Sequence, residues 1–380
     1  MKKAWYRFFC LLYSLLLLTS CTPASSENQA PMNKSLFAMN TYNTFTVYDN
    51  TAEDVLSEAE QELKTLEALW SVTDENSEIY AINHSDGTPV EVNEYTAQLL
   101  RFALDMAEQT GGILDITTYP ILTAWGFTTG KYQIPTEEQL AEKMALVGYE
   151  KVLLSGNTVT LPAGMEIDLG AVAKGYACDL LAETFSENGI DSAIISLGGG
   201  LRLIGTKPDG SDFKVSVQHP EQQDSLGTLE LSDTSIVTSG AYQRFFVGTD
   251  GKRYGHILDP RTGYPAQSGL ASVTVIAKEN KLCDALSTSL FVMGLDDAEQ
   301  FWREYKEFEM FLITDNGEIY LTEGLETRFT PAEKYRNTPI HMIWTIQLTQ
   351  NSCKNLRKKQ LAASVTPLSW NSYVRNAIKA

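Results

Sequence analysis

A turn that contains glycine and leads into a helical pattern carries a lysine, within the run DLGAVAKGYACD at residues 168–179. Backbone N–H groups at a helix start and the positive end of the helix dipole favour anions. The ammonium of Lys174, in the first turn of that helix, could reach an oxygen of a bound phosphate. A lysine near a helix start is also common as a solvated surface residue. On this motif alone both interpretations, phosphate site and surface lysine, stay open.

A second run, CDALSTSLFVMG at residues 283–294, is rich in small and apolar residues and predicts a buried helix that ends at glycine. Asp284 and Thr288 stand four residues apart, so their oxygens project from one helix face. A hard cation that prefers oxygen ligands could bind there and keep sites open for phosphate oxygens. Alternatively, Asp284 caps the helix and Thr288 bonds back to a backbone carbonyl.

Three further runs combine polar residues with turns. In YGHILDPRTGYP, residues 254–265, His256 precedes a rigid Asp-Pro unit. The run SLGGGLR, residues 196–202, holds three consecutive glycines, which permit close backbone approach to a ligand or simply a tight turn. The run TSGAYQR occupies residues 238–244. Each run by itself is ordinary.

Helical and strand patterns must position these runs. Apolar residues at helical spacing between residues 55 and 69 predict one helix, and two more are predicted over residues 94–109 and 173–188, each stopped by glycine. Strand-like runs are predicted at 36–48, 152–154, 193–197, 214–218, 226–231, 272–277, 309–314 and 319–322, the last two joined by an Asn-Gly turn. Strands and helices without a regular βαβ rhythm indicate an α+β fold.

Size and composition exclude several classes of protein. The chain has 380 residues, 43% of them hydrophobic and 10% aromatic, which is enough for a large core. Its formal net charge of -18 would repel the phosphates of nucleic acid, so nucleic acid is not an expected partner. The spacings of its cysteines and four histidines indicate neither a disulfide scaffold nor a zinc site.

The N-terminal sequence predicts an export signal. Basic residues precede an apolar run at 8–18 that is too short to span a membrane, so residues 1–20 are predicted to be a signal peptide. The sequence up to Cys21 resembles a bacterial lipobox, in which this cysteine takes the lipid and becomes the mature N-terminus. Residues 21–35 are predicted to be a lipid-anchored linker. We therefore expect a protein tethered to the extracytoplasmic face of the cell membrane. The alternative, a short buried helix ending in cysteine, is disfavoured by the linker-like residues that follow.

The C-terminus differs in composition from the rest. Residues 331–380 contain eight Lys or Arg and one acidic residue, in a chain that is otherwise strongly acidic. This segment is predicted to be a basic appendage. Attraction to anionic lipid headgroups is one interpretation, and a solvated tail without a role is the favoured one.

Taken together and in this order, the five runs resemble the ApbE family of FAD:protein FMN transferases, also called flavin transferases. The resemblance extends to FAMNTY at 37–42 and to GGILDIT at 111–117, which leads into WGF at 125–127. It covers about residues 36–322, most of the expected mature chain and none of the basic tail. Several long motifs in the right order are far more specific than any single short one.

The resemblance implies an α+β fold of mixed sheets with packed helices, forming one catalytic unit of two closely joined lobes over residues 36–325. It implies that Mg²⁺ is held by Asp284, Thr288 and the carbonyl of Ala171. The residues that it places around FAD are Met39, Ile113, Leu114, Asp115, Asp168, Lys174, Gly255 and His256. This agrees with the separate interpretation of a phosphate-binding lysine turn and a cation-binding helix face.

The implied reaction is attack by a threonine or serine hydroxyl of an acceptor protein on the FMN-side phosphorus of FAD, with AMP as leaving group. The implied acceptor is a membrane redox subunit or a secreted FMN-binding domain. Asp284 (through the metal) and Lys174 would offset phosphate charge. His256 would accept the hydroxyl proton, or alternatively hold adenine or phosphate.

Two positions depart from the family pattern, which often has Asn at Gly200 and Tyr near Thr73. Neither removes a proposed metal ligand, so altered FAD affinity is expected before loss of chemistry. The rival functions are an Mg²⁺-dependent FAD pyrophosphatase, in which water replaces the acceptor, a flavin-binding lipoprotein without chemistry, and a structural lipoprotein.

Overall fold

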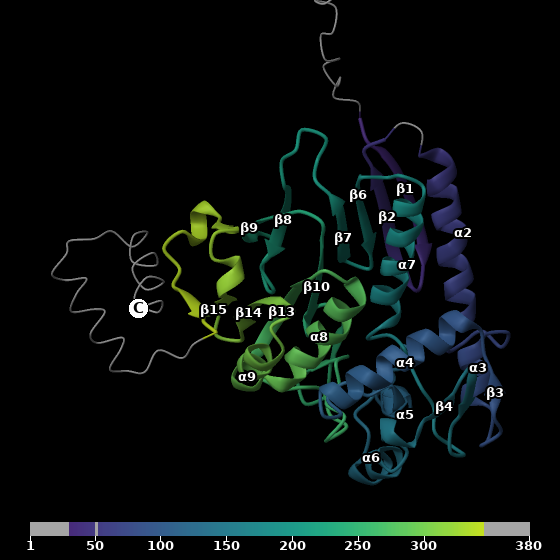
Figure 1. Ribbon diagram of the computed structural model, residues 1–380. Helices are drawn as coiled ribbons and strands as arrows, with labels where there is room; N and C mark the ends of the chain where they lie inside the picture. Colours follow the sequence, from purple (N-terminus) through teal and green to yellow (C-terminus); the bar gives the residue numbers. More distant parts are fainter. Residues whose placement is uncertain (1–29, 50–51, 346–380) are drawn as a thin grey trace, which may run out of the picture.

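A nine-stranded sheet is the main structural element of the molecule. The computed structural model describes residues 30–49 and 52–345 (Figure 1). The strand order is β1-β2-β6-β7-β10-β13-β14-β15-β17, and neighbours are antiparallel except for the parallel pair β15 and β17. These strands are β1 (Met32–Ala38), β2 (Thr41–Val47), β6 (Ser192–Leu197), β7 (Gly200–Gly205), β10 (Thr234–Gly240), β13 (Leu270–Ala277), β14 (Glu309–Thr314), β15 (Ile319–Thr322) and β17 (Ile340–Ile343).

Helices cover one face of this sheet. They are α2 (Glu53–Trp70), α7 (Ala173–Glu187), α8 (Asn280–Met293) and α9 (Leu295–Tyr305). Helix α2 lies along β1 and α7, and α8 lies across β10 and β13. The helices turn apolar stripes to the sheet, as Leu56, Ala59, Leu63 and Leu66 do in α2, because residues three and four apart share a helix face.

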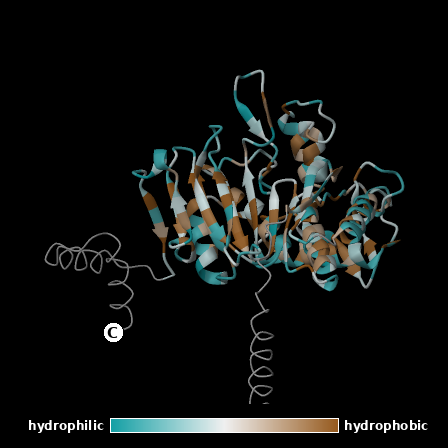
Figure 2. Ribbon diagram, turned by 90° about the horizontal axis from the view of Figure 1, so that it is seen from above, coloured by the Kyte–Doolittle hydropathy of each residue, from teal (hydrophilic) through white to brown (hydrophobic). Residues whose placement is uncertain are grey.

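A small second sheet covers part of the opposite face. Its order is β16-β9-β8, with bounds β8 (Phe213–Gln218), β9 (Ser225–Leu231) and β16 (Phe329–Pro331). Phe213 and Leu229 from this sheet share an apolar cluster with Leu203 and Phe311 of the large sheet. Seen from above, brown apolar residues recur along the strands of the large sheet (Figure 2), and its central strands β13 and β14 bury residues on both faces.

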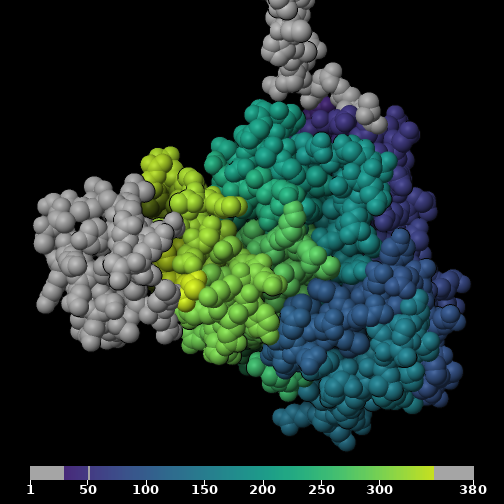
Figure 3. Space-filling model, in the orientation of Figure 1, coloured from purple at the N-terminus to yellow at the C-terminus, as the bar shows by residue number. Residues whose placement is uncertain are grey.

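A helical lobe packs against one end of this body (Figure 3). It contains α3 (Glu78–Asn83), α4 (Glu94–Gln109), α5 (Tyr119–Trp125), α6 (Glu137–Met144), the 3₁₀ turns Ile116–Thr118 and Tyr149–Lys151, and the sheet of β3 (Val90–Glu91), β5 (Thr158–Thr160) and β4 (Leu153–Ser155). Trp125, Phe127 and Leu140 form an apolar cluster of their own with Leu258. Beside that cluster lies the hairpin of β11 (Phe245–Val247) and β12 (Arg253–Gly255).

Most expected elements are confirmed. The helix over 94–109 has the expected bounds, and the helix expected over 173–188 is α7, which ends one residue earlier. The hairpin of β14 and β15 turns at the expected Asn-Gly pair, where Gly317 has φ 83°. The α+β fold of mixed sheets with packed helices is also confirmed.

The prediction of a single strand over residues 36–48 is wrong in one respect, because this segment belongs to two strands. Strand β1 begins at Met32 and turns back after Ala38, and β2 begins at Thr41. The two turn residues, Met39 and Asn40, have φ of 50° and 57°. Left-handed conformations at both positions are typical of the tight turns that join antiparallel strands. The prediction rested on the aromatic and threonine-rich composition of the run, and this composition does not mark the turn.

Two expected boundaries also need correction. Residues 32–35 lie in β1 rather than in the linker expected over 21–35. Residues 331–345, expected in the basic appendage, include β17, where Ile343 is buried. The ordered body therefore extends beyond residues 36–325. The predicted signal peptide, Cys21 and residues 346–380 lie outside the described residues. No helix in the described ranges is long and apolar enough to cross a membrane.

Candidate active site

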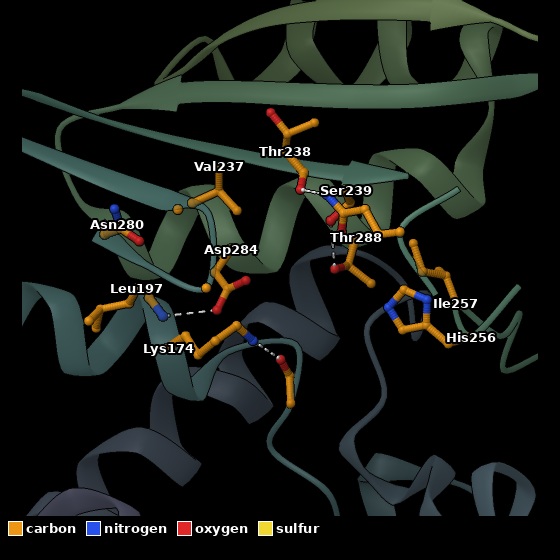
Figure 4. A pocket seen from close by; sticks show the side chains of 15 residues that line it. Lys174, Leu197, Val237, Thr238, Ser239, His256, Ile257, Asn280, Asp284 and Thr288 are labelled. Atoms are coloured by element: carbon orange, nitrogen blue, oxygen red, sulfur yellow. Dashed lines mark hydrogen bonds between the residues drawn. The ribbon is translucent and has the colours of Figure 1, made fainter. Parts of the chain in front are cut away.

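A cavity lies where the starts of α7 and α8 meet the ends of the central strands. It is lined by Gly170, Lys174, Gly175, Leu197, Gly198, Gly200, Val237, Thr238, Ser239, Gln243, His256, Ile257, Asn280, Asp284 and Thr288. In Figure 4, Lys174 and Asp284 occupy one side of this cavity and His256 the other, with Ser239 and Thr288 between them. All five runs singled out in the sequence therefore contribute to one cavity.

The starts of α7 and α8 are locked together by carboxylates that each accept from the other helix. Gly175 N–H, in the first turn of α7, donates to Asp284 Oδ2 at 2.9 Å. In return, Asp179 of α7 accepts from the N–H groups of Asn280 and Lys281 at 2.7 and 2.9 Å. Both contacts satisfy N–H groups that a helix start leaves without partners. They also fix where Asp284 stands relative to Lys174.

Only glycine permits this close approach of the two helices. A Cβ atom at Gly175 would lie 2.6 Å from the Asn280 carbonyl oxygen and 2.6 Å from Asp284 Cβ. The packing explains why a glycine follows Lys174 inside a helix, where glycine is otherwise unfavourable.

The first alternative for Asp284, a cap of its own helix, is wrong. Helix α8 begins at Asn280 with Glu279 as N-cap, so Asp284 lies in the second turn. Asp284 is 6% exposed, and its carboxylate caps α7 instead. Burial raises the pKa of Asp284, while the Lys174 ammonium and the Gly175 N–H act in the opposite direction by favouring the carboxylate.

Thr288 stands on the same face of α8 and points into the cavity (Figure 4). Its hydroxyl lies 3.3 Å from the hydroxyl of Ser239 on β10, which is itself 2.9 Å from that of Ser287. These contacts differ from the back-bond to a carbonyl that was the alternative for Thr288. The hydroxyl is therefore available to a ligand in the cavity.

The oxygens around this point suit a hard cation. Asp284 uses one oxygen for Gly175 and keeps the other, and the Thr288 hydroxyl lies on the same helix face. Ala171 stands next to Gly170, which lines the cavity, in the turn before α7. Within the described ranges no three His, Cys, Asp or Glu side chains gather as a metal cluster. Magnesium commonly binds through one or two carboxylates and completes its shell with water and substrate phosphate, so this oxygen set fits it.

Lys174 and Asp168 organise the turn in front of α7. The Lys174 ammonium donates to the Gly170 carbonyl at 2.9 Å (Figure 4). Asp168 Oδ1 accepts the Gly170 N–H at 2.8 Å, and burial raises the pKa of its carboxyl. Asp168 and Lys174 thus shape a turn whose lysine head reaches the cavity.

His256 follows directly after Gly255, the buried last residue of β12. Its Nδ1 lies 3.1 Å from the backbone carbonyl of Arg244. Because a carbonyl can only accept, this contact assigns the proton of the neutral ring to Nδ1 and leaves the lone pair on Nε2. Burial, as the largest cause, lowers the pKa of His256 to about 4. The ring is therefore neutral at physiological pH.

Six of the residues that the resemblance places around FAD, including Asp168 and Gly255, lie outside the lining of this cavity. The side chains of Ile113 and Leu114 are buried in the main core. Asp115 caps the following 3₁₀ turn through Thr117 and accepts the Tyr149 N–H at 3.0 Å. Met39 occupies the left-handed turn of the first hairpin, where its N–H donates to Glu67 at 2.6 Å. Their roles toward FAD stay predictions.

The two departures from the family pattern lie in different surroundings. Gly200 lines the cavity, and a Cβ there would lie 3.2 Å from Val237 and 3.5 Å from the Asn280 side chain, so a larger residue needs small shifts. Thr73 is exposed, and its N–H donates to the Ser71 hydroxyl. Of the two departures from the family pattern, Gly200 is therefore the one that can contact a ligand in the cavity.

Sequence reasoning assigned no role to several residues that line the cavity. Asn280 is buried and donates to the Leu201 carbonyl at 2.8 Å, which ties α8 to β7. Ser239 and Gln243 belong to the run TSGAYQR, which was noticed without a function. Small and polar residues at a strand end were a signal for a functional site in this run. Their neighbours in the cavity come from distant parts of the chain, so the sequence alone did not reveal their role.

The model of the ApbE family matches residues 39–312, which is more than half of the chain. This chain belongs to the ApbE family. The FAD:protein FMN transferase of Haemophilus influenzae is 34% identical over 298 residues, covering 75% of this chain and 86% of the relative. The FAD:protein FMN transferase of Treponema pallidum is 31% identical, with coverage of 70% and 78%.

Solved structures of ApbE proteins share the fold. The ApbE protein of Thermotoga maritima superposes with a TM-score of 0.74 at 32% identity, covering 79% of this chain and 99% of its own. The flavin transferase ApbE of Vibrio cholerae gives a TM-score of 0.70 at 27% identity, with coverage of 78% and 99%. The match to the ApbE family thus includes the α7 and α8 starts that build the cavity.

Proposed function

We propose that this chain is an FAD:protein FMN transferase that uses Mg²⁺ to move FMN from FAD onto a threonine or serine hydroxyl of an acceptor protein, with release of AMP. One observation supports this most: Lys174, Asp284, Thr288 and His256, from three distant runs, line a single cavity. Membership in a family whose curated relatives bear this activity in their names supports it further.

The start of α7 would receive the pyrophosphate of FAD. Backbone N–H groups and the helix dipole favour anions there, and Lys174 adds a full positive charge. Asp284, Thr288 and the Ala171 carbonyl would hold Mg²⁺. When bound, the cation would neutralise negative charge on the phosphate oxygens and on the leaving group. Together these groups reduce the charge that repels an incoming nucleophile.

His256 would take the proton of the acceptor hydroxyl. Its Nδ1 is bound to the Arg244 carbonyl, so the unprotonated Nε2 is the atom that can accept. The acceptor oxygen forms a bond to the FMN-side phosphorus, and the bond from that phosphorus to the bridging oxygen breaks. AMP leaves with the bridging oxygen.

The direct test is incubation of the protein with FAD, Mg²⁺ and an acceptor protein from the same cell. We expect the acceptor to gain the mass of one FMN less one water on threonine or serine, with equimolar AMP detected by chromatography. Formation of free FMN and AMP, with no mass gained by the acceptor, would identify a pyrophosphatase instead. Tight FAD binding with no AMP at all would leave a flavin-binding protein.

We also propose that the protein is lipid-anchored through Cys21 at the extracytoplasmic face of the cell membrane. The lipobox-like sequence before Cys21 supports this. Cys21→Ser should move the protein from the membrane fraction to the soluble fraction, because the thiol that carries the lipid is lost. Membrane fractionation and lipid labelling measure this, and an unchanged distribution with retained label would contradict the anchor.

A further inference from the structure

The base of the β11–β12 hairpin borders the cavity. Gln243, just before β11, and His256, just after β12, both line the cavity. One face of the hairpin is packed inward, where Phe246 stacks on Tyr132 and on Tyr254 at 5.1 and 5.3 Å between ring centroids. These rings pack the inward face of the hairpin against the cluster of Trp125 and Phe127.

The other face of the hairpin is apolar and exposed. Phe245 is 36% and Val247 63% exposed. On the neighbouring loop, Tyr132, which stacks on Phe246 from the inward side, and Ile134 are also partly exposed, at 42% and 39%. These are four of the ten large hydrophobic side chains that stand exposed in the described part of the chain. Concentration of such side chains beside a cavity is typical of an interaction surface.

The same surface is basic, although the protein is acidic. Residues 128–134 and 243–254 contain Lys131, Arg244, Lys252 and Arg253 against the single acid Asp250, in a chain of net charge -18. The Arg253 guanidinium lies 4.3 Å from the centre of the Phe245 ring, and Lys252 is 3.9 Å from Asp250. We call residues 128–134 and 243–254 the rim surface. Its charge favours a partner with acidic side chains.

The hairpin also offers an unpaired strand edge. The bonds from His256 N–H to the Arg244 carbonyl and from Gly248 N–H to the Lys252 carbonyl fix the hydrogen-bonded register. Phe245 and Val247 alternate with these positions, so their N–H and C=O groups point away from β12. Among the described strands β11 has β12 as its only neighbour. Such an edge can pair with an added strand.

We infer that the rim surface binds the segment of the acceptor protein that carries the acceptor hydroxyl, as an extended strand with acidic and aliphatic side chains added to β11. This inference rests on the proposed function, which requires a protein hydroxyl to enter the cavity. Gln243 lies two residues from Phe245, which is about 7 Å along a strand. A hydroxyl two or three residues beyond the paired stretch would therefore reach the cavity.

Two synthetic peptides of equal length test the charge preference. Each carries one threonine and the same Leu and Val residues. The acidic peptide has Asp and Glu at the positions where the basic peptide has Lys. By fluorescence anisotropy with the full chain, FAD and Mg²⁺, the acidic peptide should bind about tenfold more tightly, as a few exposed charge pairs can supply. The double variant Lys252→Glu, Arg253→Glu should reverse this preference. Equal affinity of the two peptides for the unaltered protein would overturn the inference.

A backbone variant tests strand addition itself. Val247→Pro removes an N–H that the hairpin does not use, so the hairpin should persist while the added strand loses a donor. Val247→Thr keeps the N–H and a β-branched side chain and is the matched control. We expect the proline variant to bind the acidic peptide at least about tenfold more weakly than the threonine variant. Equal binding by the two variants would contradict strand addition.

FAD binding by the same variants, measured through FAD fluorescence, separates the proposed function from the inference about the rim surface. Neither Val247 nor Arg253 lines the cavity, so FAD binding should be unchanged in all of them. If the unaltered protein failed to bind FAD, the proposed function would fail whatever the peptides did. Normal FAD binding without a peptide preference would instead refute the rim surface alone.

Discussion

Asp284 makes a structural contact that its sequence position alone does not reveal, in addition to its proposed role as a metal ligand. One carboxylate oxygen accepts the Gly175 N–H and so stabilises the start of α7. The other has no such partner within the described part of the chain, and Asp284 and Thr288 both line the cavity, where we propose that a cation binds. If Asp284 holds Mg²⁺ as proposed, a substitution there changes both helix packing and metal binding. Only a variant that keeps the contact with Gly175 can isolate the effect on the metal.

Asp284→Asn preserves an oxygen for the Gly175 N–H but removes the charge. We expect the fold to persist and Mg²⁺-dependent AMP formation to fall by about a hundredfold or more, because fixed charge stabilisation in a site of this kind is worth several kcal/mol. Chromatography of AMP and thermal unfolding measure the two effects. Asp209→Asn, at an exposed position, is the control. Full activity of the Asp284→Asn variant would remove the metal assignment.

The depressed pKa of His256 predicts an unusual pH profile. Burial lowers this pKa to about 4, so the ring stays neutral as pH falls from 7 to 5 and gains its proton only near pH 4. If Nε2 accepts the hydroxyl proton, the acidic limb of kcat/KM should lie near pH 4 rather than near 6.5. His256→Gln should lose most of the activity at every pH. An acidic limb near 6.5 would show that burial does not control this ring.

At the scale of elements, the site depends on two helix starts that cap each other. Asp179 of α7 accepts from the first N–H groups of α8, and Asp284 of α8 accepts from the first turn of α7. Burial raises the pKa of Asp179 to about 6, and the two N–H donors act against that rise. The pair of helices therefore behaves as one unit, in which the position of each start determines that of the other.

Gly175→Ala should break this unit. In most helices the change from glycine to alanine stabilises by about 0.5–1 kcal/mol. Here a Cβ would lie 2.6 Å from atoms of α8, so the helices must move apart. We expect a loss of about 1–3 kcal/mol in the free energy of unfolding and weaker Mg²⁺ activation.

Denaturant unfolding and a Mg²⁺ titration of AMP formation measure these two losses. Ser186→Ala, on the exposed side of the same helix, is the control and should change neither quantity. A Gly175→Ala protein that is more stable than the unaltered one would show that α7 and α8 are not closely packed in solution.

At the scale of the whole molecule, the large sheet includes a strand from residues 331–345. The basic composition of residues 331–380 predicts an appendage there instead. Strand β17 pairs in parallel with β15. Ile340 and Met342 pack on the cluster beneath the small sheet, and Ile343 packs into the main core on the helical side. The last strand therefore completes both layers of the molecule.

Two truncations test this boundary. A chain that ends at Thr338 lacks β17 and should lose about 2 kcal/mol or more in the free energy of unfolding, since apolar side chains are left without their partners. A chain that ends at Thr345 keeps β17 and should unfold at the same temperature as the full chain. Calorimetry compares them. Equal stability of the two truncated chains would contradict a structural role for β17.

The sequence by itself determined the fold class, the four longest helices and the residue types of the site. Helical periodicity and glycine stops are local signals, and they placed α2, α4 and α7 correctly. The spacing of Asp284 and Thr288 is likewise local, because four residues make one helical turn. The ordered motifs from residue 37 to 294 were enough to indicate the family.

Only the tertiary structure decided which of these residues meet. The partner of Asp284 is Gly175, from a helix more than a hundred residues earlier, and the proton position on His256 depends on the Arg244 carbonyl. Strands β7, β10 and β17 were missed for the same reason. A strand is stabilised by neighbours that can lie anywhere in the chain, whereas a helix bonds to itself. The cavity and its rim surface arise from such distant contacts.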